Sequence, residues 1–170
     1  MTRGPGSVLA VGGAACALLA AGWALSPVKR VILNTTASAP LGFYWLVDDR
    51  PKAGDLALVR PPPSLARWMA VRGYLPLNVP LIKHVAAVSG QSVCVRGGMV
   101  EIDGRSVGKV LTRDLVGRPL VAARLCRPLR VGEVFLLNPD APRSLDGRYF
   151  GPLPCASIVG RLHPLWTWER

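Results

Sequence analysis

The 170-residue sequence has few of the side chains on which most hydrolases and metalloproteins depend. It contains two histidines, and none of its ten Asp and Glu residues clusters with either, so a Ser-His-Asp triad has little support. The carboxylates lie mostly in turn dipeptides, which indicates neither a paired-carboxylate hydrolase nor a metal site. No cysteine pair has the C-x-x-C spacing of a zinc site, and no phosphate-binding pattern follows the glycines of GGMVEIDG. We therefore expect no metal and no cofactor.

Acidic residues are scarce as well: 21 Lys and Arg against ten Asp and Glu give a formal net charge of +11. Such a charge is typical of proteins that bind nucleic acid or anionic lipid headgroups. Here, however, the arginines are dispersed, with no long run of like charges and no basic helical stripe with interleaved aromatic residues. The sequence thus predicts a generally basic surface and no specific nucleic-acid partner.

Long hydrophobic segments are limited to one, at residues 7–25, which carries no charge and is followed by Pro27, Lys29 and Arg30. About 20 apolar residues span the hydrocarbon core of a bilayer, so the segment predicts an N-terminal transmembrane helix. A cleavable signal peptide is the alternative, because GWA before Leu25 has the small residues of a cleavage site. Residues 1–27 are interpreted as a membrane anchor or signal segment, and residues 28–170 as one domain on one side of the membrane.

Sixteen prolines and eighteen glycines, spread along the chain, favour many short strands and turns, so we expect a mainly β domain. The strands are expected in residues 28–47 (two, with an irregular turn between them), at Leu56–Val59, at Val134–Leu137 and around Ser157–Leu162. One short helix is expected in SLARWMAVRGYL, with Ser64 as its N-cap and Leu65, Trp68 and Met69 on one side. Hairpin tips are expected at residues 97–98 and 103–104.

Two of the four cysteines, Cys94 and Cys126, flank a stretch of expected strands and turns. If the domain is exported, a disulfide joins them; otherwise they are buried thiols. The sequence leaves both possibilities open.

Lys83 has an unusually apolar setting in PLIKHVAAV. Burial penalises the ammonium form, lowers the pKa of the amine and lets the neutral form accept a proton. The alternative is that Lys83 points to solvent from an edge strand. A base needs a nucleophile, and Ser38 in TASAPLG is the candidate, because its small neighbours leave room for a substrate and the rigid turn after it directs the hydroxyl.

Thr36, two residues before Ser38, is a candidate for stabilising an oxyanion beside the Ser38 backbone N–H. A desolvated lysine can activate a serine hydroxyl without a histidine or a carboxylate, so Ser38 and Lys83 together form a candidate dyad. The alternative is an Asx or Ser/Thr turn that merely ends the linker.

The stretches TASAPLGFYWL, PLIKHVAAVSG and NPDAPRSLDGRYFGPLP resemble, in order and spacing, the successive boxes of the serine–lysine signal peptidases. Within that family, the short chain and the S-x-P-x-G-x-Y pattern are most similar to the TraF branch, which serves conjugative transfer. The resemblance covers about residues 8–162 and implies that Ser38 is the nucleophile and Lys83 the general base. It gives Thr36 the place of a second oxyanion-hole hydroxyl, and Ser144 the place of a serine that hydrogen-bonds the lysine amine.

The same match gives Asp146 and Arg148 the place of an ion pair that holds the last box against the active site. Three positions depart from the family's pattern. Ala39 stands where a methionine commonly follows the nucleophile, His84 where an arginine commonly follows the base, and Gly147 where a serine is usual. None of these departures removes a catalytic atom.

The resemblance further implies a signal-peptidase-like β core with a smaller β excursion at about residues 91–130. It implies an endopeptidase anchored in the bacterial inner membrane, with the catalytic domain on the periplasmic side, that cleaves signal or propeptide segments after an Ala-x-Ala-like sequence. The expected partners are a protein substrate (a pilin precursor or another exported preprotein), membrane lipid and other components of the conjugation machinery. Whether water or an amine of the substrate resolves the acyl-enzyme, the latter by head-to-tail closure, stays open.

Two other interpretations also stay open. A general type I leader peptidase would share the site and differ in substrate range. A membrane-tethered, non-catalytic β module of a secretion channel would use its basic surface to bind DNA or lipid.

Overall fold

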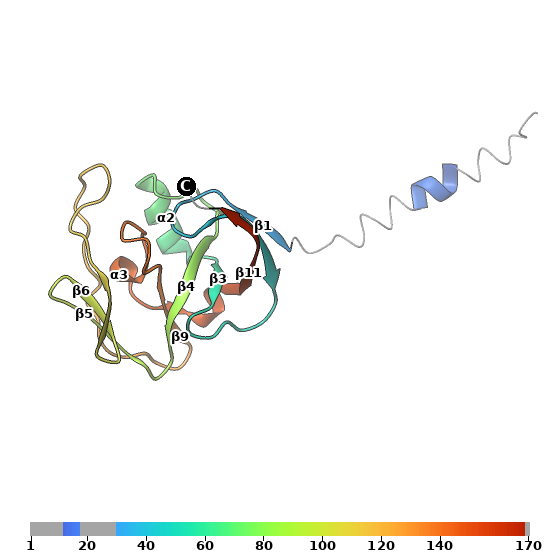
Figure 1. Cartoon of the computed structure of the whole chain (residues 1–170). Helices are drawn as coiled ribbons and strands as arrows, with labels where there is room; N and C mark the ends of the chain where they lie inside the picture. The colour runs from blue at the N-terminus through green and yellow to red at the C-terminus, as the bar shows by residue number, and fades with distance from the viewer. Residues whose placement is uncertain (1–11, 18–29, 169–170) are drawn as a thin grey trace, which may run out of the picture. The chain divides into compact units, whose positions relative to one another are not determined.

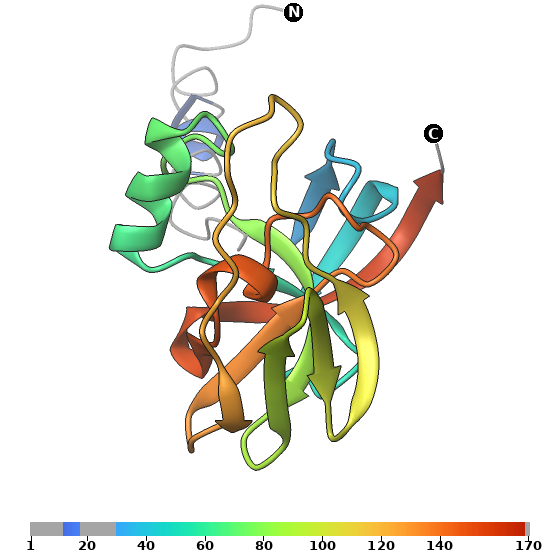
Figure 2. The same cartoon turned by 90° about the vertical axis from the view of Figure 1, so that its left-hand side faces the viewer.

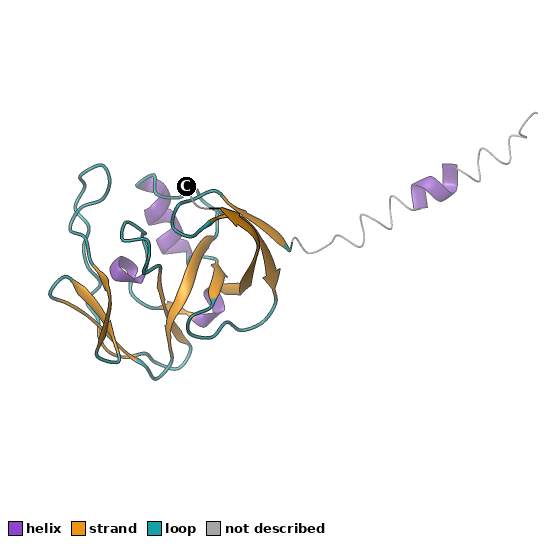
Figure 3. Ribbon diagram, viewed as in Figure 1, coloured by secondary structure: helices purple, strands orange, loops and turns teal. Residues whose placement is uncertain are grey.

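The computed structural model describes residues 12–17 and 30–168. The chain separates into two units, Met1–Arg30 and Val31–Arg170, and the elements below belong to the second. Strands dominate that unit, and its helices are short (Figure 3), as the many prolines and glycines predict. The expected anchor lies outside the described residues except for residues 12–17, which are helical. No helix in the described ranges is long and apolar enough to cross a bilayer.

Seven strands form the larger sheet, in the order β1-β2-β11-β3-β4-β9-β10, and all neighbouring strands are antiparallel. Their bounds are β1 Val31–Asn34, β2 Leu41–Val47, β3 Leu56–Val59, β4 Leu81–Val88, β9 Glu133–Leu137, β10 Leu153–Pro154 and β11 Ile158–Trp168. The sequence predicts β3 with these bounds and β9 to within one residue. β11 continues past Leu162 to Trp168, because this aromatic end of the chain pairs with β2.

Four further strands form a separate sheet, in the order β7-β6-β5-β8. Their bounds are β5 Ser92–Arg96, β6 Met99–Ile102, β7 Arg105–Lys109 and β8 Cys126–Pro128. The hairpin tips at residues 97–98 and 103–104 lie where the sequence predicts them, and the sheet lies within the range expected for the β excursion. A disulfide between Cys94 and Cys126 joins β5 to β8, so the structure has the first of the two possibilities that the sequence left open.

Both faces of β9 are buried, which places the larger sheet between two hydrophobic cores. Val134 and Leu136 belong to the core beneath the helix α2 (Pro63–Val71), whereas Phe135 and Leu137 pack against the second sheet. Because side chains alternate along a strand, consecutive apolar residues of β9 point alternately into the two cores. In Figure 1 the second sheet accordingly lies to one side of β4 and β9, and the strands β1 and β11 lie to the other.

The helix α2, Pro63–Val71, covers the larger sheet with the face that the sequence predicts. Met69 is buried, and Leu65 and Trp68 pack beside it. The predicted cap is wrong: the helix begins at Pro63, and Ser64 is already inside it. Proline suits the first helical position because its φ is preset and its missing N–H would have no helical partner there.

A second helix, α3 at Gly147–Phe150, was not predicted, and neither was the 3₁₀ turn η1 at Cys155–Ser157. The side chain of Asp146 caps α3 by accepting a hydrogen bond from the backbone N–H of Arg148. Four residues are too few to show a helical hydrophobic period, so the expectation of a single helix was incomplete.

Candidate active site

Lys83 lies in β4, an inner strand between β3 and β9, and its side chain is only 3% exposed. The interpretation that it points to solvent from an edge strand is therefore wrong. Nζ of Lys83 donates a hydrogen bond to Oγ of Ser144 at 2.7 Å, a contact that the resemblance implies. Burial lowers the pKa of Lys83 to about 8, while the Asp146 carboxylate opposes this shift and the Arg148 guanidinium adds to it. The amine can therefore lose its proton close to neutral pH.

The loop that carries Ser38 is folded around the side chain of Asn34, the last residue of β1. Asn34 Nδ2 donates, at 3.0 Å each, to three backbone oxygens of this loop, those of Thr36, Ala39 and Pro40. Asn34 Oδ1 accepts hydrogen bonds from the backbone N–H and the hydroxyl of Thr36, at 3.0 and 2.9 Å. Sequence reasoning missed Asn34, although an asparagine directly before Thr-Thr is the usual signal for such a turn.

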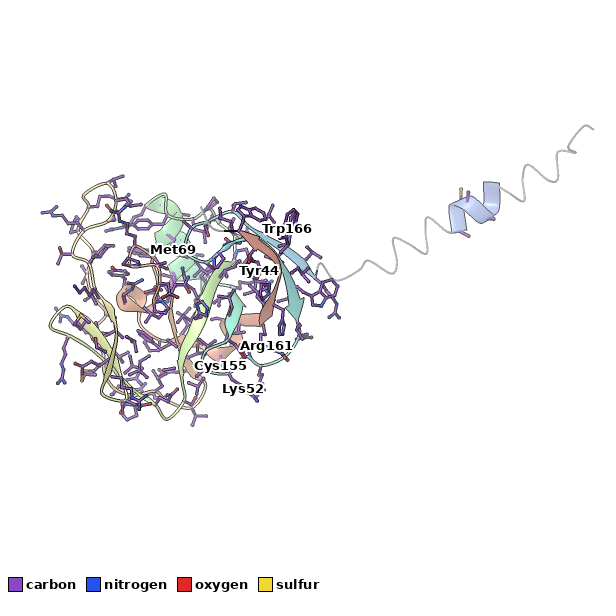
Figure 4. The ribbon with its side chains drawn as sticks, viewed as in Figure 1. Tyr44, Lys52, Met69, Cys155, Arg161 and Trp166 are labelled. Carbon is purple, nitrogen blue, oxygen red and sulfur yellow. A yellow bond between two sulfur atoms is a disulfide. The ribbon has the colours of Figure 1, made fainter. Side chains whose placement is uncertain are left out.

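Two contacts hold the chain where it leaves the Ser38 loop and enters β2. The hydroxyl of the buried Tyr44 donates to the backbone oxygen of Pro40 at 2.6 Å. Gly42 has φ +140°, and a Cβ there would collide with the backbone oxygen of Trp166 in β11. Figure 4 shows Tyr44 and Trp166 at this end of the sheet. The glycine and the tyrosine of the S-x-P-x-G-x-Y pattern therefore fix the exit of the loop.

The hydroxyl groups of Thr36 and Ser38 are neighbours, with 3.3 Å between the two Oγ atoms. Thr36 has one hydroxyl proton and donates it to Asn34, so its oxygen is left to accept the proton of Ser38. In this arrangement Thr36 has no proton for an oxyanion and would have to rotate to donate one. The backbone N–H of Ser38 has no acceptor within residues 30–168, so it is available to an incoming oxygen.

Asn138, at the end of β9, ties the Ser38 loop to β4. Its Nδ2 donates to the backbone oxygens of Ser38 and of Ile82, the latter at 3.2 Å. Its Oδ1 accepts the backbone N–H of His84 at 3.0 Å and lies 3.2 Å from Nδ1 of the same histidine. Because an amide oxygen can only accept, this contact assigns the imidazole proton to Nδ1 of His84. Sequence reasoning did not single out Asn138, because an asparagine directly before a proline is common in ordinary turns.

Asp146 and Arg148 form a fully buried ion pair, with 2.7 Å between Arg148 Nη2 and Asp146 Oδ2. Asp146 also accepts the backbone N–H of Asn138 at 3.2 Å. The guanidinium of Arg148 donates to four backbone oxygens, those of Lys109, Ala141, Pro142 and Ser144. The pair therefore sets the path of the loop that presents Ser144 to Lys83.

Ser38 lies between two cavities. A cavity of about 430 Å³ is lined by Ser38, Lys83 and Ser144, and one of about 400 Å³ is lined by Ser38, His84 and Asn138. No hydrogen bond within residues 30–168 joins Ser38 Oγ to Lys83 Nζ, although both residues line the same cavity. Because Lys83 and His84 are adjacent in a strand, they line different cavities on the two sides of the Ser38 loop.

The residues at this site bring together the parts that acyl transfer requires: a hydroxyl, an amine with a lowered pKa and an available N–H donor. In the part of the chain that the structure describes, no three His, Cys, Asp or Glu side chains gather into a group that could hold a metal ion.

Comparison with known proteins gives a consistent result. The family model "Signal peptidase, peptidase S26" matches residues 7–167. "Probable conjugal transfer protein TraF" of Sinorhizobium fredii (strain NBRC 101917 / NGR234) is 40% identical over 152 residues, which are 80% of this chain and 77% of that protein. "Plasmid transfer protein TraF" of Escherichia coli is 30% identical over 170 residues, or 94% of each chain. A solved signal peptidase I from Enterococcus faecalis V583 is 23% identical, and the match covers 69% of this chain and 100% of that one with a TM-score of 0.43.

Proposed function

Since the chain belongs to the signal peptidase family, peptidase S26, we propose that it is a serine endopeptidase with Ser38 as nucleophile and Lys83 as general base. The observation that carries the proposal is the state of the Lys83 amine. It is buried, hydrogen-bonded to Ser144 at 2.7 Å and lowered in pKa to about 8, and it lines the same cavity as Ser38. A lysine with a purely structural role would gain no stability from burial that lowers the pKa of its amine.

In the proposed reaction, the lone pair of neutral Lys83 takes the proton of Ser38 Oγ while this oxygen attacks the carbonyl carbon of the scissile peptide bond. The Ser38 backbone N–H donates to the oxygen that becomes negative, and Thr36 joins it after its hydroxyl turns away from Asn34. The Lys83 ammonium then protonates the leaving nitrogen, the C–N bond breaks, and an ester at Ser38 remains. Substrate binding must bring Ser38 and Lys83 into contact, since such hydrogen bonds commonly tighten only in the complex.

Hydrolysis repeats these steps with water, whose proton passes to Lys83 as its oxygen attacks the ester. An amino group of the substrate can take the place of water, which would close the peptide into a ring. The names of two relatives refer to conjugal or plasmid transfer, which supports an exported protein of the conjugation machinery as the substrate. By the resemblance, a pilin precursor cleaved after an Ala-x-Ala-like sequence is the first candidate.

Membrane lipid is the second proposed partner, with the domain of residues 28–170 on the periplasmic side of the inner membrane and residues 1–27 as its anchor. Exposed apolar side chains on β1, β2 and β11 support this proposal. They are Val31, Leu33, Phe43, Trp45, Leu165, Trp166 and Trp168. Tryptophan is favoured at membrane interfaces because one end of the ring system is polar and the rest is apolar. Trp166, which is 70% exposed, marks this surface in Figure 4.

The test is processing of a pilin precursor, or of an Ala-x-Ala peptide, by the purified full chain and its variants. Ser38→Ala and Lys83→Ala should abolish cleavage, while His84→Ala should retain most of it. Equal damage from His84→Ala and Lys83→Ala would overturn the assignment of the base. If the wild-type chain cleaves nothing and instead binds DNA in a salt-dependent way that survives Ser38→Ala, the non-catalytic alternative is correct.

A further inference from the structure

A second large cavity opens beside the one that contains Ser38 and Lys83. It has a volume of about 630 Å³ and is lined mainly by residues of the loop between β7 and β8. Four residues line both cavities: Tyr74, Leu115, Arg143 and Leu145. Because these four residues line both, the two cavities are adjacent.

The second cavity is preformed, because its loop is fastened to the C-terminal end of α2. Asp114 accepts hydrogen bonds from the Tyr74 hydroxyl and from Arg118 Nε, both at 2.6 Å. Arg118 also donates to the backbone oxygen of Arg72 at 2.7 Å, and its guanidinium lies 4.7 Å from the centre of the Tyr74 ring. Figure 2 shows this loop rising beside α2. A wall held by these contacts needs little ordering when a ligand binds.

The charge of this cavity is positive after its internal pairs are taken into account. Asp114 is its only carboxylate, and it is neutralised by Arg118. Burial raises the pKa of Asp114, but the hydrogen bonds from Tyr74 and Arg118 outweigh this and hold it well below its usual range. Within residues 30–168, neither Arg113 nor Arg143 has a carboxylate partner, and Arg113 donates only to the backbone oxygen of Gly117. Two guanidinium groups are therefore left for a ligand.

The remaining walls are apolar. Leu111, Leu120 and Leu145 line the cavity, and Leu115 and Val116, at its rim, are each more than 70% exposed. Arginines set among exposed aliphatic side chains suit a carboxylate whose neighbours are apolar, since a planar guanidinium binds carboxylates with two parallel hydrogen bonds.

We propose that this cavity is a substrate subsite for an acidic side chain, with Arg143 as the residue that determines the preference. Arg143 is placed for this role by its sequence neighbour, Ser144, which contacts Lys83, and by its position in the wall between the two cavities. The proposal rests on the proposed peptidase function and adds a requirement on the substrate: Glu or Asp, flanked by apolar residues, at one fixed distance from the scissile bond.

The experiment uses the full chain and a panel of Ala-x-Ala peptides in which a single Glu, or a matched Gln, is moved stepwise away from the scissile bond. At one position, Glu should raise kcat/KM over Gln by roughly 1.5- to fivefold at low salt, the range expected for a partly exposed charge pair. The effect should appear mainly in KM and shrink as salt is added. Arg143→Gln should abolish the Glu preference, and Arg143→Glu should convert it into a preference for Lys at that same position.

Arg105→Gln is the matched control, because it removes one exposed arginine that lines neither cavity. It should keep the Glu preference at the wild-type value. Equal kcat/KM for Glu and Gln peptides at every position, in a chain that cleaves them, would overturn the subsite and leave the peptidase function intact. An Arg143→Gln variant that keeps the preference would overturn the role of Arg143. A wild-type chain that cleaves no peptide at all contradicts the peptidase function itself.

Discussion

Replacing Asn138 by alanine tests whether the nucleophile is held in place through the amide that joins its loop to β4. The change removes the donors to the backbone oxygens of Ser38 and Ile82 and the acceptor of the His84 N–H. Each buried group left without a partner costs about 1–3 kcal/mol, so with partial access of water the loss in folding free energy should be about 2–4 kcal/mol. Catalysis should suffer further, because a shift of about 1 Å in a reacting atom can cost about a hundredfold in rate.

The assay measures kcat and KM on a cleavable peptide, together with the melting temperature of each variant. For Asn138→Ala we expect kcat to fall about a hundredfold with little change in KM, because Asn138 does not line the cavity that contains Ser38 and Lys83. Asn138→Asp should be at least as damaging, since a carboxylate oxygen would face the two backbone oxygens that the amide nitrogen now binds. His84→Ala is the matched control: it removes the ring contact to Asn138 and leaves both amide donations.

A folded Asn138→Ala variant with wild-type kcat would refute this reasoning, because Ser38 would then be positioned without the amide. A loss of activity that equals the unfolded fraction at the assay temperature would also refute it, since Asn138 would then contribute only to stability.

Three other predictions concern Lys83, the buried ion pair and the disulfide. Because the neutral amine of Lys83 is the proposed base, kcat/KM should rise with pH and level off above about 8; a flat profile between about pH 6 and pH 9 would contradict this. The folded pKa of about 8 lies below the ordinary value of 10.5, so the unfolded chain binds more protons between these values. Stability should therefore rise over this window by about 3 kcal/mol relative to Lys83→Met, as checked by denaturant unfolding. Arg148→Met leaves the Asp146 carboxylate buried without its partner and should lower the free energy of unfolding by about 3–5 kcal/mol, with loss of cleavage; an unchanged melting temperature would contradict it. Replacing Cys94 and Cys126 together by serine, at a sequence separation of 32, should cost about 3 kcal/mol in stability and leave kcat nearly unchanged, because the active-site residues lie outside the second sheet.

Much of the fold could be predicted because its signals are local. Strand β3 is bounded by turn residues, and glycines mark the hairpin tips at residues 97–98 and 103–104. The predicted cap at Ser64 was wrong because proline is favoured in the first helical turn. The helix therefore begins at Pro63, one residue before the serine. Helix α3 gives no local signal, since it is four residues long and depends on the Asp146 side chain.

The contacts of the candidate site could not be predicted in the same way, because they join residues far apart in the chain. Lys83 reaches Ser144 across 61 residues, and Asn138 reaches Ser38 across 100. Nothing local distinguishes Ser144 from a turn serine, so its place beside the lysine came only from the family resemblance. Asn138 was not found even by that route.

The side-chain amides of Asn34 and Asn138 hold the Ser38 loop, and the proposed chemistry explains why amides suit this position. The loop borders two cavities, so large side chains cannot pack around Ser38 without filling the space that a substrate needs. It must therefore be held through its backbone, and a side-chain amide is an uncharged group that both donates and accepts for this purpose. An ionised group in the place of Asn34, which lines the same cavity as Lys83, would shift the pKa of the amine: a carboxylate would raise it, and a further cation would lower it. Neutral amides hold the Ser38 loop and leave the pKa of Lys83 to burial, which is the largest cause of its shift.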